Sequence, residues 1–198
     1  MVITQVLNKQ LINTSKIVDV LISLLIIIGS FLVPTFLAKL IPLGKYQQIL
    51  IGTIVNTSLI LTAIYTKGTF KTLSIVTLPS ISTILGGILF TEITAYSKIM
   101  IPSIWFGNFT LIFLYKWLFV NKKYNYIISA FFAIIVKVSI IYFSFVLMTK
   151  TMQIPEIAKQ TLNISMGITQ LITAISASVI VFFITYYIKK KNINNSRV

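Results

Sequence analysis

Side chains that commonly carry out enzyme chemistry are scarce in this 198-residue chain. Cysteine and histidine are both absent, and Asp and Glu together number only 3. Without Cys or His, the chain has no disulfide, no usual zinc site, and no nucleophile or proton relay based on a thiol or an imidazole. Asp19, Glu92 and Glu156 lie in different regions, so they offer no acid–base pair or metal cluster. We therefore expect a protein that is not an enzyme and holds no metal or cofactor.

Charge is also scarce, at 10% of the residues against 57% hydrophobic residues, and the mean hydropathy is +0.95. A soluble domain typically has about 25% charged residues, so this chain lacks the polar side chains to cover a water-facing surface. Its 17 Lys and Arg residues are dispersed between long apolar runs rather than gathered on one stripe. That pattern favours a membrane protein and argues against nucleic acid as a partner.

Six apolar stretches are long enough to cross a bilayer, whose hydrocarbon core of roughly 30 Å requires about 20 helical residues. They are 17–38, 48–65, 73–90, 99–120, 126–148 and 163–188. Pro34 should kink the first stretch, and Pro79 should bend the third. The sequence thus predicts an all-α integral membrane protein, in which residues 1–198 form one compact bundle of six transmembrane helices.

The positions of Lys and Arg predict the orientation of this bundle. Eleven of the 17 fall on one side of the predicted membrane and 5 on the other, and Lys137 lies inside a span. The positive-inside rule places both termini, including the basic tail 189–198, in the cytoplasm. Segments 1–15 and 149–162 have apolar residues spaced so that they could lie along the membrane surface. We interpret Asp19 as a favourable charge at a helix start or a local ion pair with Lys16.

The sequence lacks the two features on which active transporters that need no separate energising subunit usually depend. No G-x-x-x-x-G-K-[ST] sequence is present, and none of the 3 acidic residues falls near the centre of a predicted span. Nucleotide hydrolysis and ion-driven transport usually depend on such groups. Any active transport by this chain is therefore expected to draw its energy from a partner.

Lys137 is the polar residue in the spans that most requires an explanation, because it lies about eleven residues from either end of its helix and hence near the midplane. A lysine at that depth is too far from the interface to snorkel easily. It could bind a carboxylate, phosphate or carbonyl group of a substrate. Alternatively, it could donate to helix-end carbonyls or a polar neighbour and hold the bundle together.

Other polar side chains are predicted near Lys137. In the predicted topology, Asn108, Lys137 and Gln170 all lie on the order of 10–17 Å below the outer surface at 1.5 Å per residue. Trp105 lies on the Asn108 face of its helix, and Asn163 on the Gln170 face. Glu92, beyond the outer end of the third span, could close a pocket there. The candidate substrate-binding residues are therefore Glu92, Trp105, Asn108, Lys137, Asn163 and Gln170.

Structural interpretations of these residues stay open. Trp105 could belong to an interfacial aromatic belt, and Asn108 could bond across helices. Asn56 is interpreted as a hydrogen-bonding residue between helices. Ala174 and Ala177 continue the Gln170 face as a packing seam of small residues.

The stretch from Leu78 to Phe90, LPSISTILGGILF, is followed by the stretch from Met100 to Asn108, MIPSIWFGN, and then by Lys137. Together with the plan of about 200 residues and six spans, these features resemble the substrate-capture (S) components of energy-coupling-factor (ECF) transporters of bacteria. The resemblance covers nearly the whole chain through its plan. The first span lacks the Ala-x-x-x-Ala pattern that several members carry for docking.

The resemblance implies a multi-pass protein of the bacterial plasma membrane that binds a small micronutrient, a vitamin or related heterocycle, with high affinity. A pterin, a flavin or a thiamin precursor would fit. It further implies that a transmembrane coupling protein and two ATPase subunits supply the energy for uptake. Two alternatives stay open, a structural or assembly protein of the membrane and a stand-alone facilitator.

Overall fold

A computed structural model of the chain describes residues 2–11, 16–40, 45–86 and 94–195. These residues form helices joined by short connections, and no strand occurs among them, which confirms the predicted all-α class. Six of the helices have at least 15 residues: α2 (Lys16–Leu40), α3 (Lys45–Tyr65), α4 (Thr69–Gly86), α6 (Ile101–Tyr115), α7 (Tyr126–Thr151) and α9 (Ile168–Asn195).

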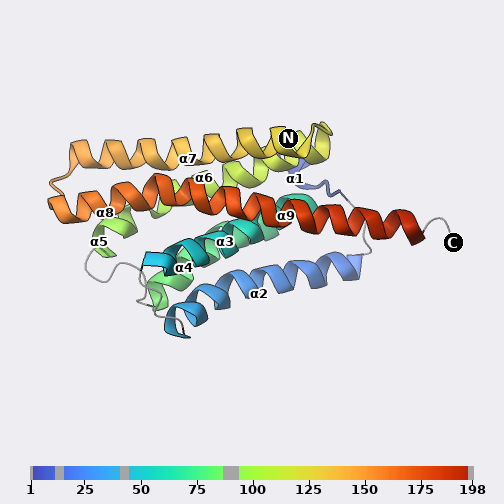
Figure 1. Cartoon of the computed structure of the whole chain (residues 1–198), viewed down its shortest axis with the longest axis horizontal. Helices are drawn as coiled ribbons and strands as arrows, with labels where there is room; N and C mark the ends of the chain where they lie inside the picture. The colour runs from blue at the N-terminus through green and yellow to red at the C-terminus, as the bar shows by residue number, and fades with distance from the viewer. Residues whose placement is uncertain (1, 12–15, 41–44, 87–93, 196–198) are drawn as a thin grey trace.

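The six long helices lie along one another, and consecutive ones run in opposite directions (Figure 1). Helix α6 continues into the π-helical turn η1 (Lys116–Asn121). Helix α1 (Val2–Leu7) packs near η1, and α5 (Thr94–Ile99) and α8 (Glu156–Met166) lie at the opposite end of the bundle (Figure 1).

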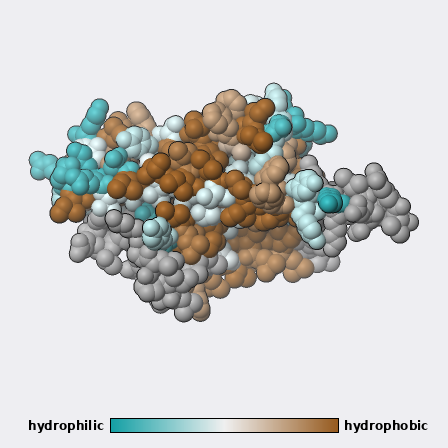
Figure 2. All heavy atoms as spheres, in the orientation of Figure 1, coloured by the Kyte–Doolittle hydropathy of each residue, from teal (hydrophilic) through white to brown (hydrophobic). Residues whose placement is uncertain are grey.

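Within the described ranges, four stretches are long and apolar enough to cross a membrane: 46–65, 101–121, 126–151 and 156–188. Helix α2 covers the first predicted span, but the apolar stretch found there, Asp19–Leu32, is shorter than the four candidate spans. Helix α4 covers most of the third predicted span and is not among the four, since it includes Lys71 and many Ser and Thr residues. Figure 2 shows apolar side chains over the middle of the visible face and hydrophilic ones at both ends. The chain therefore has the helices of a multi-pass membrane protein.

Helix α3 occupies the centre of the bundle and packs against α2, α6 and α9. Leu59, Ile60 and Ala63 of α3 are fully buried in the main apolar core, as are Ala174 and Ala177 of α9. The two alanines confirm the predicted seam of small residues, because they let two helices approach closely. This central position allows α3 to present its side chains to several helices at once.

The ion pair of Asp19 joins two helices. Asp19, in the first turn of α2, bonds to the Lys71 ammonium group on α4. Ser82 of α4 also donates to the carbonyl oxygen of Phe31 on α2, over 2.6 Å. The predicted place of Asp19 at a helix start is confirmed, and its ion pair is with a residue 52 positions away, which the sequence did not indicate. The side chain of Lys16, the other predicted partner, lies outside the described residues.

The predicted sixth span, 163–188, is not one continuous helix. Helix α8 ends at Met166, Gly167 adopts φ −100° and ψ −99°, and α9 begins at Ile168. A Cβ atom at Gly167 would lie 2.9 Å from the carbonyl oxygen of Asn163, so a residue with a side chain would clash there. The prediction was wrong at this point because it assumed one helical periodicity through Gly167.

Gly107 permits the close approach of α6 to α7. A Cβ atom at this position would lie 2.8 Å from Ile141 Cγ1 and 3.3 Å from the carbonyl oxygen of Lys137. We expect Gly107→Ala to lower the free energy of unfolding by about 1–3 kcal/mol, the usual cost of overpacking. Thermal unfolding in detergent measures this loss. Gly29→Ala is the control, because no atom lies within 4 Å of a Cβ there; equal melting of the two variants would contradict the prediction.

Candidate functional site

A cavity of about 130 Å³ lies among α3, α4, α6, α7 and α9. Ile51, Val55, Ile104 and Met166 form apolar parts of its wall. Its polar lining comes from helices far apart in sequence and comprises Gln48, Asn56, Ser80, Asn108, Lys137, Thr169, Gln170 and Thr173. An apolar cavity with a few convergent polar groups is the usual form of a small-molecule site.

Among the described residues of this lining, Lys137 is the only charged one, and it is 1% exposed. Its Nζ donates to Oδ1 of Asn56 on α3. The Asn56 Nδ2 in turn donates to Oγ1 of Thr173 on α9, over 3.0 Å. This chain of hydrogen bonds joins α7, α3 and α9, and it confirms that Asn56 bonds between helices.

The hydrogen-bonding capacity of the cavity is only partly used. An ammonium group has three N–H donors, and Asn56 is the one acceptor that Lys137 has in the described part of the chain. The side-chain amides of Asn108 and Gln170 line the same cavity and have no hydrogen-bond partner among the residues that the structure describes. A buried cation with spare donors beside two free amides is suited to a ligand with hydrogen-bond acceptors or a negative charge.

The structure brings together three of the six predicted site residues, Asn108, Lys137 and Gln170. Trp105 packs against the main core instead, and its buried Nε1 has no partner among the described residues. Asn163 lines a separate hollow between α7 and the α8–α9 break, because Gly167 interrupts the helix that was expected to align it with Gln170. Glu92 lies outside the described residues.

Sequence reasoning missed the contribution of α3 to this cavity. Gln48, Gly52 and Asn56 are spaced four residues apart, so they share one face of α3. That face lines the cavity, and Gln48 there accepts a hydrogen bond from Ser165 of 3.2 Å. The spacing was visible in the sequence, but nothing in it indicated which way the face points.

No family model, curated protein or solved structure shows significant similarity to the chain.

Proposed function

We propose that the protein is a membrane-embedded binding subunit that captures a small solute for uptake. The observation that supports this most is the Lys137 ammonium group, which is buried at this cavity with one amide oxygen as its partner among the described residues. An ionisable residue inside a membrane bundle usually serves function, because its burial is costly. A carboxylate, phosphate or carbonyl group of a ligand would supply the missing acceptors.

The volume of the cavity narrows the class of ligand. An engineered cavity of about 150 Å³ holds one benzene molecule, and this cavity is about 130 Å³. The proposed ligand is therefore a compact solute of about one ring that carries an acidic or carbonyl group. A flavin or a pterin would require the side chains around Lys137 to move apart.

The proposed topology has six spans, with α2 and α4 added to the four long apolar segments and both termini in the cytoplasm. The asymmetry of Lys and Arg supports this orientation. On the resemblance to ECF S components, a coupling protein and two ATPases in a bacterial plasma membrane would energise uptake, and this chain would carry out no chemistry.

A structural or assembly role is the second candidate. The hydrogen bonds from Lys137 to Asn56 and from Asn56 to Thr173 favour it, because they join three helices. In that case the protein would bind no solute, and substitution of Lys137 would impair folding itself.

Recovery of a bound solute tests the proposed function. We expect mass spectrometry of the purified protein to reveal one small acidic or carbonyl-bearing molecule, which raises the melting temperature in proportion to the logarithm of its concentration. Asn108→Ala should weaken its binding about tenfold, since one hydrogen bond to a charged or polar partner is lost. Asn163→Ala is the matched control, because Asn163 is exposed and lines another hollow. Equal affinities of the two variants would rule out this cavity as the site.

A further inference from the structure

A second hollow lies at the end of the bundle where α7 begins, and it combines an apolar groove with a polar mouth. The groove, of about 360 Å³, runs between α7 and α9 and is lined by Ala130, Ile134, Ile175 and Val179. The mouth, of about 740 Å³, is lined by Gln10, Lys123, Tyr124, Asn125 and Tyr186. Tyr126, Ile127 and Phe182 line both, so the groove and the mouth adjoin at these three side chains.

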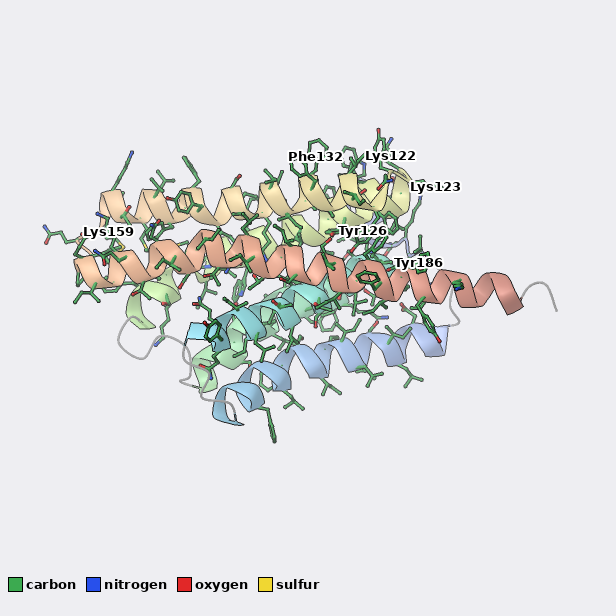
Figure 3. All side chains as sticks on the ribbon, viewed as in Figure 1. Lys122, Lys123, Tyr126, Phe132, Lys159 and Tyr186 are labelled. Carbon is green, nitrogen blue, oxygen red and sulfur yellow. The ribbon has the colours of Figure 1, made fainter. Side chains whose placement is uncertain are left out.

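The mouth has positive charge without a neighbouring acid among the described residues. Figure 3 shows Lys122, Lys123, Tyr126 and Tyr186 at the same end of the bundle and Lys159 at the opposite end. The two acidic residues that the structure describes have partners outside the mouth. Asp19 lies at the same end of the bundle but outside this lining and pairs with Lys71, and Glu156 lies 3.6 Å from Lys159 at the opposite end. An anionic group in the mouth would therefore meet Lys123 with no competing carboxylate from this part of the chain.

Lys123 is held in an uncommon backbone conformation, with φ +60°, the left-handed region that favours glycine or asparagine. It immediately precedes the Tyr124 and Asn125 wall of the mouth, and Asn125 Oδ1 accepts the backbone N–H of Ile127 at the start of α7. The turn thus places Lys123 in the lining of the mouth, directly before the residues that begin α7.

From the adjacency of the groove and the mouth and from the charge of Lys123, we propose that the two together bind one phospholipid with an anionic headgroup. The phosphate would lie beside Lys123, and the hydroxyl groups of Tyr124 and Tyr186 and the amide of Asn125 offer donors in the same mouth. An acyl chain would continue past Phe182 into the groove between α7 and α9. Anionic lipids are attracted to cationic segments at a membrane surface. A soluble phosphate could occupy the mouth, but it has no apolar chain to fill the groove, so the groove favours a lipid. This inference does not depend on the proposed function, because the cavity around Lys137 has a separate lining.

Native mass spectrometry of the full chain in detergent, with added dioleoyl phosphatidylglycerol or dioleoyl phosphatidylcholine, tests this inference. We expect the anionic lipid to bind about fivefold more tightly, because its headgroup has a net negative charge, whereas the choline group of the other lipid neutralises the same phosphate; one lysine near an anionic headgroup contributes about 1 kcal/mol. Lys123→Asn should abolish that preference, because asparagine tolerates the left-handed conformation and removes only the charge. Lys122→Asn is the matched control, since it removes an equal charge one residue away from the lining.

The groove has its own test. Val179 is 50% exposed, so Val179→Trp should fold and fill the groove, weakening the binding of both lipids. Leu25→Trp should leave binding unchanged, because Leu25 lies on α2, outside the groove, and is 72% exposed. Glycerol phosphate at millimolar concentration should not displace the lipid, because it has no acyl chain. The proposal would be overturned if the two lipids bind equally or if Lys122→Asn and Lys123→Asn have equal effects. It would also be overturned if glycerol phosphate displaces the lipid fully or if a folded Val179→Trp variant binds lipid as well as the wild-type protein.

Discussion

Lys137→Met is expected to abolish ligand-dependent thermal stabilisation while leaving the melting temperature of the ligand-free protein unchanged or raised. The substitution keeps the length of the side chain and removes the ammonium group that has Asn56 as its one described partner. A charged residue near the centre of a membrane helix costs about 2.5–3.5 kcal/mol. The bond lost at Asn56 Oδ1 leaves an unsatisfied acceptor that costs about 1–3 kcal/mol. The two effects nearly cancel, so stability without ligand should not fall.

Thermal unfolding of purified protein, with and without the solute released from the wild-type protein, measures both quantities. Lys150→Met is the control, because Lys150 is an exposed residue near the end of the same helix. A Lys137→Met variant that no longer folds would contradict the binding role and support the assembly role. A folded variant that keeps its full ligand response would exclude Lys137 from the site.

Lys116→Met is expected to destabilise the protein by about 2–4 kcal/mol. Two hydrogen bonds to a charged donor are lost, each of which contributes about 1.5–3 kcal/mol. Part of this loss is offset, because the cost of burying the ammonium group is no longer incurred. Lys116 is fully buried, and its Nζ donates to the carbonyl oxygens of Lys9, over 2.7 Å, and of Thr66. Thr66 follows the last residue of α3, where unpaired helix carbonyls favour a cation. Removal of the ammonium group would leave both carbonyl oxygens buried without this donor.

Hydrogen exchange and thermal unfolding together locate this effect. The N-terminal segment also bonds to the end of α3 through Leu11 N–H and the carbonyl oxygen of Ile64, over 2.8 Å. In Lys116→Met, the amides of Leu11 and Gly68 should exchange faster, because both join this segment to the rest of the bundle. Lys122→Met, at an exposed position nearby, should change neither readout. Unaltered exchange in Lys116→Met would show that the buried lysine does not anchor the N-terminal segment.

The two buried lysines illustrate why depth alone does not predict a role. The sequence marks Lys137 by its distance from both ends of a predicted span. Lys116 is one of the eleven basic residues that the sequence places on the cytoplasmic side of the membrane. The structure buries both, but Lys116 has two backbone carbonyls as acceptors and Lys137 has one side-chain amide. The sequence does not show the number of available acceptors. That number leads to different predictions for stability, which should fall in Lys116→Met but not in Lys137→Met.

The sequence by itself determined the all-helical class and the approximate positions of the long helices, and it predicted a similar depth for Asn108, Lys137 and Gln170. These are local properties, because the free energy of transferring each side chain from water to an apolar phase depends little on distant residues. Which helix faces meet was decided only by tertiary packing. Packing turned the Gln48–Asn56 face of α3 toward Lys137, paired Asp19 with Lys71, and separated Asn163 from Gln170 at Gly167. The rotation of each helix about its axis depends on contacts with helices far away in the chain, and no periodicity within one helix contains that information.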